Sequence, residues 1–108
     1  MRSNIQYREE RTIYMIKPEY LLEDVIRALR KLGFEPSLSE EGGARVVRAR
    51  GPGKHVELLL RSEEKVIPGL EVLGEIPITH ISLSAEGPED FITSLRYRLE
   101  VELLRCLG

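Results

Sequence analysis

Few residues in this chain have types and spacings that suggest catalysis. His80, Ser82 and Ser84 alternate with apolar neighbours, so a strand would place them on one face. A histidine beside a serine can supply the base and the nucleophile of acyl transfer. The stretch has neither the strand–turn–helix elbow that presents such a serine nor a recognisable carboxylate partner. We therefore expect no catalytic residues, which favours a protein that is not an enzyme.

The other residues that can bind metals or phosphates also lack the spacing of a site. His55 and His80 do not form the i, i+3 or i, i+4 pair of a helical metal site, and the single cysteine, Cys106, falls on an apolar helix stripe. Residues 51–54 (Gly-Pro-Gly-Lys) lack the Gly-Lys-Ser/Thr ending of a phosphate loop and suit a type II turn. We expect no metal and no cofactor.

A basic stretch between residues 44 and 61 offers the alternative of anion binding. Arginine suits bidentate contacts to phosphate, so RNA or another anion could bind an outer sheet face around Arg48, Arg50, Lys54 and His55. No aromatic residue accompanies these cations to stack on bases. The net charge of −2 is also unlike that of most nucleic-acid-binding domains. Nucleic acid is therefore a disfavoured partner.

Size and composition indicate one domain spanning residues 1–108. Hydrophobic residues make up 42% of the chain and charged residues 31%, as in an ordinary globular protein. No run is long and apolar enough for a membrane span, and the N-terminus lacks a signal-peptide pattern, which predicts a cytoplasmic location. The chain has 16 Glu and 12 Arg but one Asn and one Gln, a composition that suggests a thermophilic source.

The hydrophobic pattern predicts the elements at both ends of the chain. Arg11–Lys17 suits a strand because it is rich in β-branched and aromatic residues, and its two apolar faces favour a central position. Pro18 opens a helix whose apolar residues recur at helical spacing until Gly33 ends it. Pro88 opens a second, longer helix, preceded by an alternating strand at 76–85. We expect that strand to lie beside 11–17.

Three alternating stretches, 34–40, 44–50 and 55–61, predict an antiparallel meander between the helices. Two turns, at Gly42-Gly43 and Pro52-Gly53, set its register, and both hairpins then place their apolar residues on one face. The predicted cross-strand neighbours are Leu38 and Val47, Pro36 and Ala49, Val47 and Leu58, Ala49 and Val56, Ser37 and Arg48, Arg48 and Glu57, and Arg50 with both Glu35 and His55.

Residues 62–75 are the least regular part of the chain. We interpret 62–64 as a charged turn and expect a short strand around Leu70–Leu73 in the apolar segment 65–75, which Pro68, Gly69 and Gly74 interrupt.

The last helix has more apolar surface than one sheet can cover. Its main stripe comprises Phe91, Ile92, Leu95, Leu99, Leu103, Cys106 and Leu107. A second stripe of Tyr97, Val101 and Leu104 lies on roughly the opposite side. This stripe must meet the first helix, the 65–75 segment or another copy of the chain.

The order of elements predicts an α+β two-layer sandwich, with a mainly antiparallel sheet of five or six strands and both helices on one face. This order is similar to the TATA-binding-protein-like or helix-grip arrangement, a likeness of topology that assigns no function. A ferredoxin-like sheet is the competing architecture.

The sequence thus favours a non-catalytic binding or assembly module. We expect a homodimer formed through the last helix (Tyr97, Val101 and Leu104) or the 65–75 segment (Ile67 and Leu70). A small apolar ligand held beneath the last helix is a third, weaker hypothesis.

Overall fold

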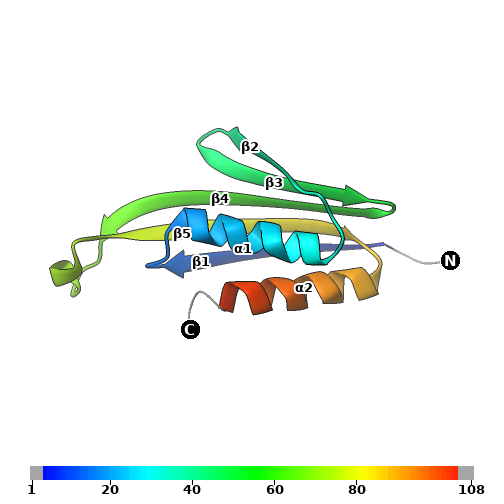
Figure 1. Ribbon diagram of the computed structural model, residues 1–108. Coiled ribbons are helices and arrows are strands. Elements are labelled where there is room, and N and C mark those ends of the chain that lie inside the picture. The colour runs from blue at the N-terminus through cyan, green and yellow to red at the C-terminus, as the bar shows by residue number, and fades with distance from the viewer. Residues whose placement is uncertain (1–3, 105–108) are drawn as a thin grey trace.

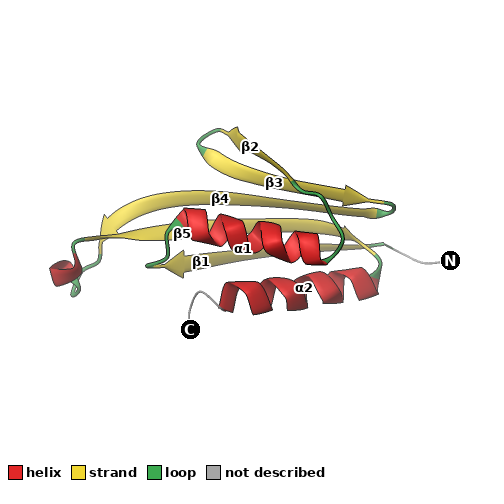
Figure 2. Ribbon diagram, in the orientation of Figure 1, coloured by secondary structure: helices red, strands yellow, loops and turns green. Residues whose placement is uncertain are grey.

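The computed structural model describes residues 4–104, and of Leu104 the backbone only. Five strands form one antiparallel sheet, and two helices lie on one of its faces (Figures 1 and 2), which confirms the predicted α+β class. The elements in chain order are β1 (Ile5–Tyr14), α1 (Pro18–Lys31), β2 (Ser37–Glu41), β3 (Ala44–Gly51), β4 (Lys54–Val66), the 3-10 helix η1 (Glu71–Leu73), β5 (Glu75–Gly87) and α2 (Glu89–Leu104).

The strands are arranged in the order β1-β5-β4-β3-β2. β1 pairs with β5 from Ile5 opposite Gly87 to Tyr14 opposite Ile78, which confirms that the first and last strands are neighbours. The predicted central position of the first strand is wrong, because β1 is an edge strand. Its N-terminal half continues back to Ile5 through four consecutive charged residues, 8–11.

Both hairpins have the predicted register. Leu38 lies opposite Val47 and Val47 opposite Leu58, so these apolar side chains share the face that the helices cover or border. The predicted neighbours of Pro36 and Glu35 are not paired, because β2 begins only at Ser37. Glu35 instead forms an ion pair with Arg30 at the end of α1, at 3.3 Å.

The segment between β4 and β5 differs from the prediction. Residues 62–64 continue β4 instead of forming a turn, and the expected strand at 70–73 is the 3-10 helix η1. The cause is local: Gly69 adopts a φ of +90°, and its backbone N–H donates to the Glu71 carboxylate at 3.1 Å. This turn closes the hairpin before a further strand can form.

The hydrophobic core lies between the sheet and the two helices. The predicted main stripe of α2 is buried from Phe91 to Leu103, while Cys106 and Leu107 lie outside the described residues. Leu95 of α2 and Leu21, Val25, Ala28 and Leu29 of α1 are wholly inaccessible to solvent. α1 and α2 pack side by side over this core (Figure 1).

Candidate functional site

A two-stranded arm projects from one end of the sheet (Figure 1). Beyond the pair Glu63–Ile78, β4 and β5 pair only with each other, because β3 ends opposite Leu60 and β1 ends opposite Ile78. We call residues 64–77 the arm. It contributes to an elongated molecule of 56 × 29 × 20 Å. A hairpin of two strands is only marginally stable by itself in water, so further packing would stabilise the arm.

The tip of the arm exposes apolar side chains. Val72 is 94% exposed, and Val66, Leu70 and Leu73 are between 44% and 49% exposed. Of the two residues predicted for an interface in this segment, Leu70 is thus exposed and Ile67 is half-buried. Clustered apolar residues at a protruding tip, unlike scattered ones, usually mark a surface that another molecule covers.

More exposed apolar residues lie at the base of the arm. Tyr14 is the last residue of β1, Met15 follows it, and Tyr20 lies in the first turn of α1; each is more than half exposed. The Met15 backbone N–H donates to the Pro77 carbonyl at 2.8 Å, which holds this base against the arm. Met15 has a φ of +71°, a conformation that costs a non-glycine residue about 1–2 kcal/mol. Together, the arm tip and this base form what we call the apolar end of the molecule.

The second stripe of α2 is only partly covered. Tyr97 remains 64% exposed and Val101 is half-buried, while the side chain of Leu104 lies outside the described part of the chain. The first helix therefore does not cover Tyr97. Between the helices, α2 presents Glu102, a residue that the sequence pattern did not single out.

Glu102 is completely buried at the contact between α1 and α2. Its carboxylate accepts hydrogen bonds from Lys31 Nζ at 2.6 Å and from Arg27 Nη1 at 3.4 Å. Arg27 also bonds the Asp24 carboxylate at 2.7 Å. Both cations are partly exposed, so the cluster lies at one edge of the core. It connects the two helices, and its cations offset the cost of burying the Glu102 charge.

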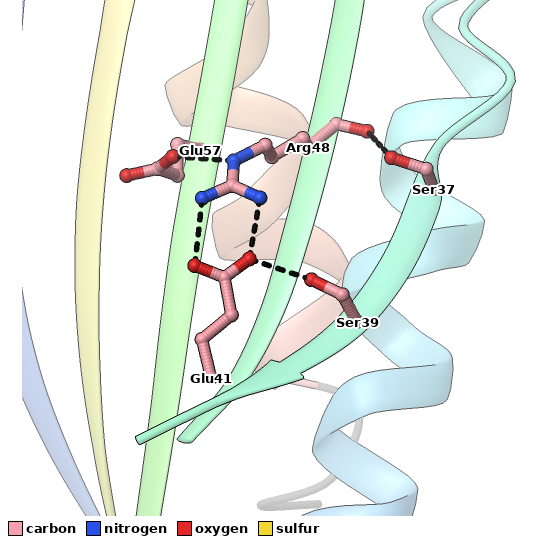
Figure 3. A network of polar contacts seen from close by, with 5 residues as sticks. All are labelled: Ser37, Ser39, Glu41, Arg48 and Glu57. Carbon is pink, nitrogen blue, oxygen red and sulfur yellow. Dashed lines mark hydrogen bonds and ion pairs between the residues drawn. The ribbon is translucent and has the colours of Figure 1, made fainter. Parts of the chain in front are cut away.

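The basic face is largely neutralised at Arg48, as Figure 3 shows. The Arg48 guanidinium donates to Glu57 at 2.7 Å and, through two nitrogens, to Glu41 at 2.6 and 3.1 Å. Ser39 donates to the same Glu41 carboxylate at 2.9 Å. Glu57 was the predicted cross-strand neighbour, whereas Glu41 was not expected. With its donors directed at two carboxylates, Arg48 is poorly placed to bind a phosphate.

Three of the four predicted anion-binding residues do lie together. Arg50, Lys54 and His55 line a shallow depression at the β3–β4 turn, which Glu86 of β5 also lines. Lys54 additionally lies over the Phe91 ring, 5.3 Å from its centroid. Arg50 and Lys54 have no ion-pair partner among residues 4–104.

His80 has two partners that the sequence did not reveal. Its Nε2 lies 2.8 Å from a Glu63 oxygen and its Nδ1 lies 3.2 Å from the Thr12 hydroxyl. Ser82, a serine on the same face, donates to Glu10 at 3.3 Å and not to His80. A hydroxyl, an imidazole and a carboxylate in series resemble a catalytic triad in order. These side chains lie in the open on the outer face, where water is not excluded, so we interpret them as cross-strand pairs.

The carboxylates of this face make stability depend on pH. Hydrogen bonds from Arg48 lower the pKa of Glu41, and a hydrogen bond with His80 lowers the pKa of Glu63, both from 4.5. The unfolded chain therefore takes up protons first on acidification, so this stabilisation is present above about pH 4.5 and is lost as the pH falls through the lower folded pKa values.

Urea unfolding from about pH 7 down to about pH 3 should show this loss, and the Arg48→Met variant should lose less stability over the same range because Glu41 no longer has that partner. An equal loss in the two proteins would contradict the assignment. Arg50→Met serves as the control, since Arg50 has no such carboxylate contact among the described residues.

The space beneath α2 is small. A cavity of about 20 Å³ lies between Leu58, Leu99 and Leu103, with Glu9, Arg11 and Arg96 at its edge. That volume accommodates about one water molecule. A small apolar ligand beneath the last helix therefore stays the weakest of the three hypotheses.

Comparison with known proteins does not place the chain in a family. No protein-family model matches the sequence, and no curated protein matches it. Within residues 4–104, no three His, Cys, Asp or Glu side chains are grouped so that they could hold a metal ion. Neither α1 nor α2, as far as the structure describes them, has the length and apolar character of a transmembrane helix.

Proposed function

We propose that the protein is a non-catalytic assembly module that associates with a second copy of itself through the apolar end. The observation that supports this most is the protruding arm, whose tip exposes Val66, Leu70, Val72 and Leu73 beyond the two helices. Burial of such side chains contributes roughly 25 cal/mol per Å² of apolar area removed from water. The arm would also become more stable when another layer packs on it.

A second copy suits this surface because it offers both halves of a reciprocal contact. The arm tip and the apolar base of Tyr14, Met15 and Tyr20 lie at the same end of one molecule. A two-fold axis can place the tip of each copy on the base of the other, which is the isologous arrangement of most dimers. The last helix, with Tyr97 exposed, is the other surface that the sequence suggested.

Sedimentation equilibrium of matched charge substitutions tests the proposal. Val72→Glu should lower the weight-average mass by half or more, because a charge at the tip cannot be buried without a large cost. Leu38→Glu places the same charge on an exposed leucine of β2, away from the arm, and should leave the mass unchanged. If only Tyr97→Glu lowers the mass, the last helix and not the arm is the contact.

The depression at Arg50, Lys54 and His55 supports a second candidate function, the binding of an RNA or another anion. Binding of a labelled single-stranded RNA should then weaken steeply with salt and be lost in Arg50→Ala/Lys54→Ala. Arg48→Ala should retain binding, because Arg48 is held by Glu41 and Glu57. Binding that is absent or independent of salt would remove this candidate.

The composition also leads us to propose a cytoplasmic protein of a thermophilic source. The clusters around Arg48 and Glu102 support the second part, because networks of ion pairs contribute more at high temperature than isolated pairs do at 25 °C.

A further inference from the structure

The edge strand β1 has features of a second surface for association. It runs for ten residues without proline, glycine or lysine, and among the described residues it pairs only with β5. Proteins commonly protect such a long edge with charged side chains, proline, a bulge or a covering segment. The charges on β1 are two arginines and two glutamates, Arg8, Glu9, Glu10 and Arg11, so a second copy of the strand can meet them with opposite charges.

Pairing of β1 with a second β1 would be antiparallel about a two-fold axis perpendicular to the sheet. The axis passes midway between one residue and the same residue of the second copy, and every other residue then faces the residue equally far on the other side of that centre. An axis at Arg8 or at Glu10 places two like charges of the outer face against each other. An axis at Glu9 places Arg8 opposite Glu10 of the second copy, twice, and Ile5 opposite Ile13, twice.

The self-opposed residue in that register is already compensated within its own copy. Glu9 accepts a hydrogen bond from Arg11 Nε at 2.8 Å and another from the Tyr7 hydroxyl. Opposite charges directly across a strand pair contribute roughly 0.2–1 kcal/mol each, and like charges destabilise. Among the registers centred on residues 8–10, the sheet layer therefore favours the one centred on Glu9.

The helix layer favours the same register independently. α2 lies over β1 with the Arg96 guanidinium 4.9 Å from the centroid of the Tyr7 ring and with Glu100 bonded to Arg11. The axis at Glu9 exchanges the positions of Tyr7 and Arg11. It therefore places Arg96 of one copy near Glu100 of the other, so opposite charges meet in both layers.

The spacing of the helices permits this arrangement. α2 contacts both β5 and β1, so it lies over the boundary between them. In the paired sheet, α2 of the second copy would lie two strand spacings from α2 of the first copy. The two helix axes would then be about 10 Å apart, which is the ordinary distance between packed helices. Tyr97 lies next to the midpoint between residues 96 and 100, so the two exposed Tyr97 side chains would approach the axis.

From these two layers we infer that β1 pairs with β1 of a second copy in the register centred on Glu9, giving one continuous ten-stranded sheet. This contact is separate from the apolar end, and it does not depend on the proposed function. A chain that uses both surfaces forms assemblies larger than a dimer.

The experiment uses the Val72→Glu chain, so that the arm contact is removed. In this background, sedimentation equilibrium should give twice the chain mass of 12.3 kDa. Adding Arg8→Glu should raise the dimer dissociation constant at least tenfold, because two like-charge pairs replace two opposite ones. Adding Glu10→Arg to that variant should restore the dimer, and Arg50→Glu, a charge change on β3, should have no effect on it.

A Val72→Glu chain that is monomeric would overturn the inference, as would an Arg8→Glu variant of unchanged mass. Failure of Glu10→Arg to restore the dimer, in a variant whose circular dichroism shows a folded protein, would also overturn it. The proposed function fails in a different way, namely if Val72→Glu leaves the mass of the otherwise unmodified chain unchanged.

Discussion

The double substitution Arg27→Met/Lys31→Met is expected to lower the free energy of unfolding by about 3–5 kcal/mol. Both cations contact the carboxylate of Glu102, which is completely buried between α1 and α2. The double variant keeps this carboxylate away from water but removes those two cations. The two cations then no longer offset the cost of removing the Glu102 charge from water. A loss of about 3–5 kcal/mol is a large part of the roughly 5–15 kcal/mol by which a typical domain is stable.

Single substitutions and a matched control define the origin of this loss. Arg27→Met alone should cost less, because Lys31 remains at 2.6 Å from the carboxylate. Arg30→Met removes the exposed pair with Glu35 on the same helix and should change stability by less than about 1 kcal/mol. Adding Glu102→Leu to the double variant should recover much of the loss, since no charge is then buried at position 102. Urea unfolding measures all four proteins, and no recovery would contradict the role of the charge.

Leu95→Ala is expected to lower the free energy of unfolding by about 2–5 kcal/mol. Leu95 has no solvent exposure and lies in the stripe of α2 that packs on the sheet, so its loss leaves a cavity as well as reducing apolar burial. Leu38→Ala makes the same chemical change at a leucine that is 52% exposed on the edge strand β2. That control should cost less than about 1 kcal/mol, and equal losses in thermal or urea unfolding would contradict the placement of the core.

The parts of the fold that the sequence predicts are those with a local cause. Pro18 and Gly33 bound α1 because a proline suits the first turn of a helix and a glycine suits its end. Gly42-Gly43 and Pro52-Gly53 fix the hairpin registers, because a slip by one residue would turn every apolar side chain of a strand outward.

The features that were not predicted depend on partners far apart in the sequence. The edge position of β1 follows from which strand lies beside β5, a choice that the strand's own composition does not encode. The length of β4 was underestimated because Ser62, Glu63 and Glu64 are polar, and a strand that extends beyond the core can carry such residues. The burial of a charged residue is also hard to predict from its neighbours in the sequence. Glu102 can be buried because Arg27 and Lys31 of α1 donate to its carboxylate.

The candidate surfaces were predicted only in part. Leu70 and Tyr97 are exposed, as the excess of apolar residues in the sequence suggested. The base at Tyr14, Met15 and Tyr20 was not predicted, because only the folded chain brings these residues next to the arm. The sequence suggested that Arg48 was available to anions, because its contact with Glu41 was not expected. Glu41 lies seven residues away and reaches Arg48 across the β2–β3 turn.

Sedimentation equilibrium of the unmodified chain over a wide range of concentrations tests self-association most directly. At high concentration we expect a weight-average mass of at least twice that of one chain, 12.3 kDa, and a fall toward the mass of one chain on dilution. The mass of a single chain at every concentration would contradict the proposal that a second copy covers the arm.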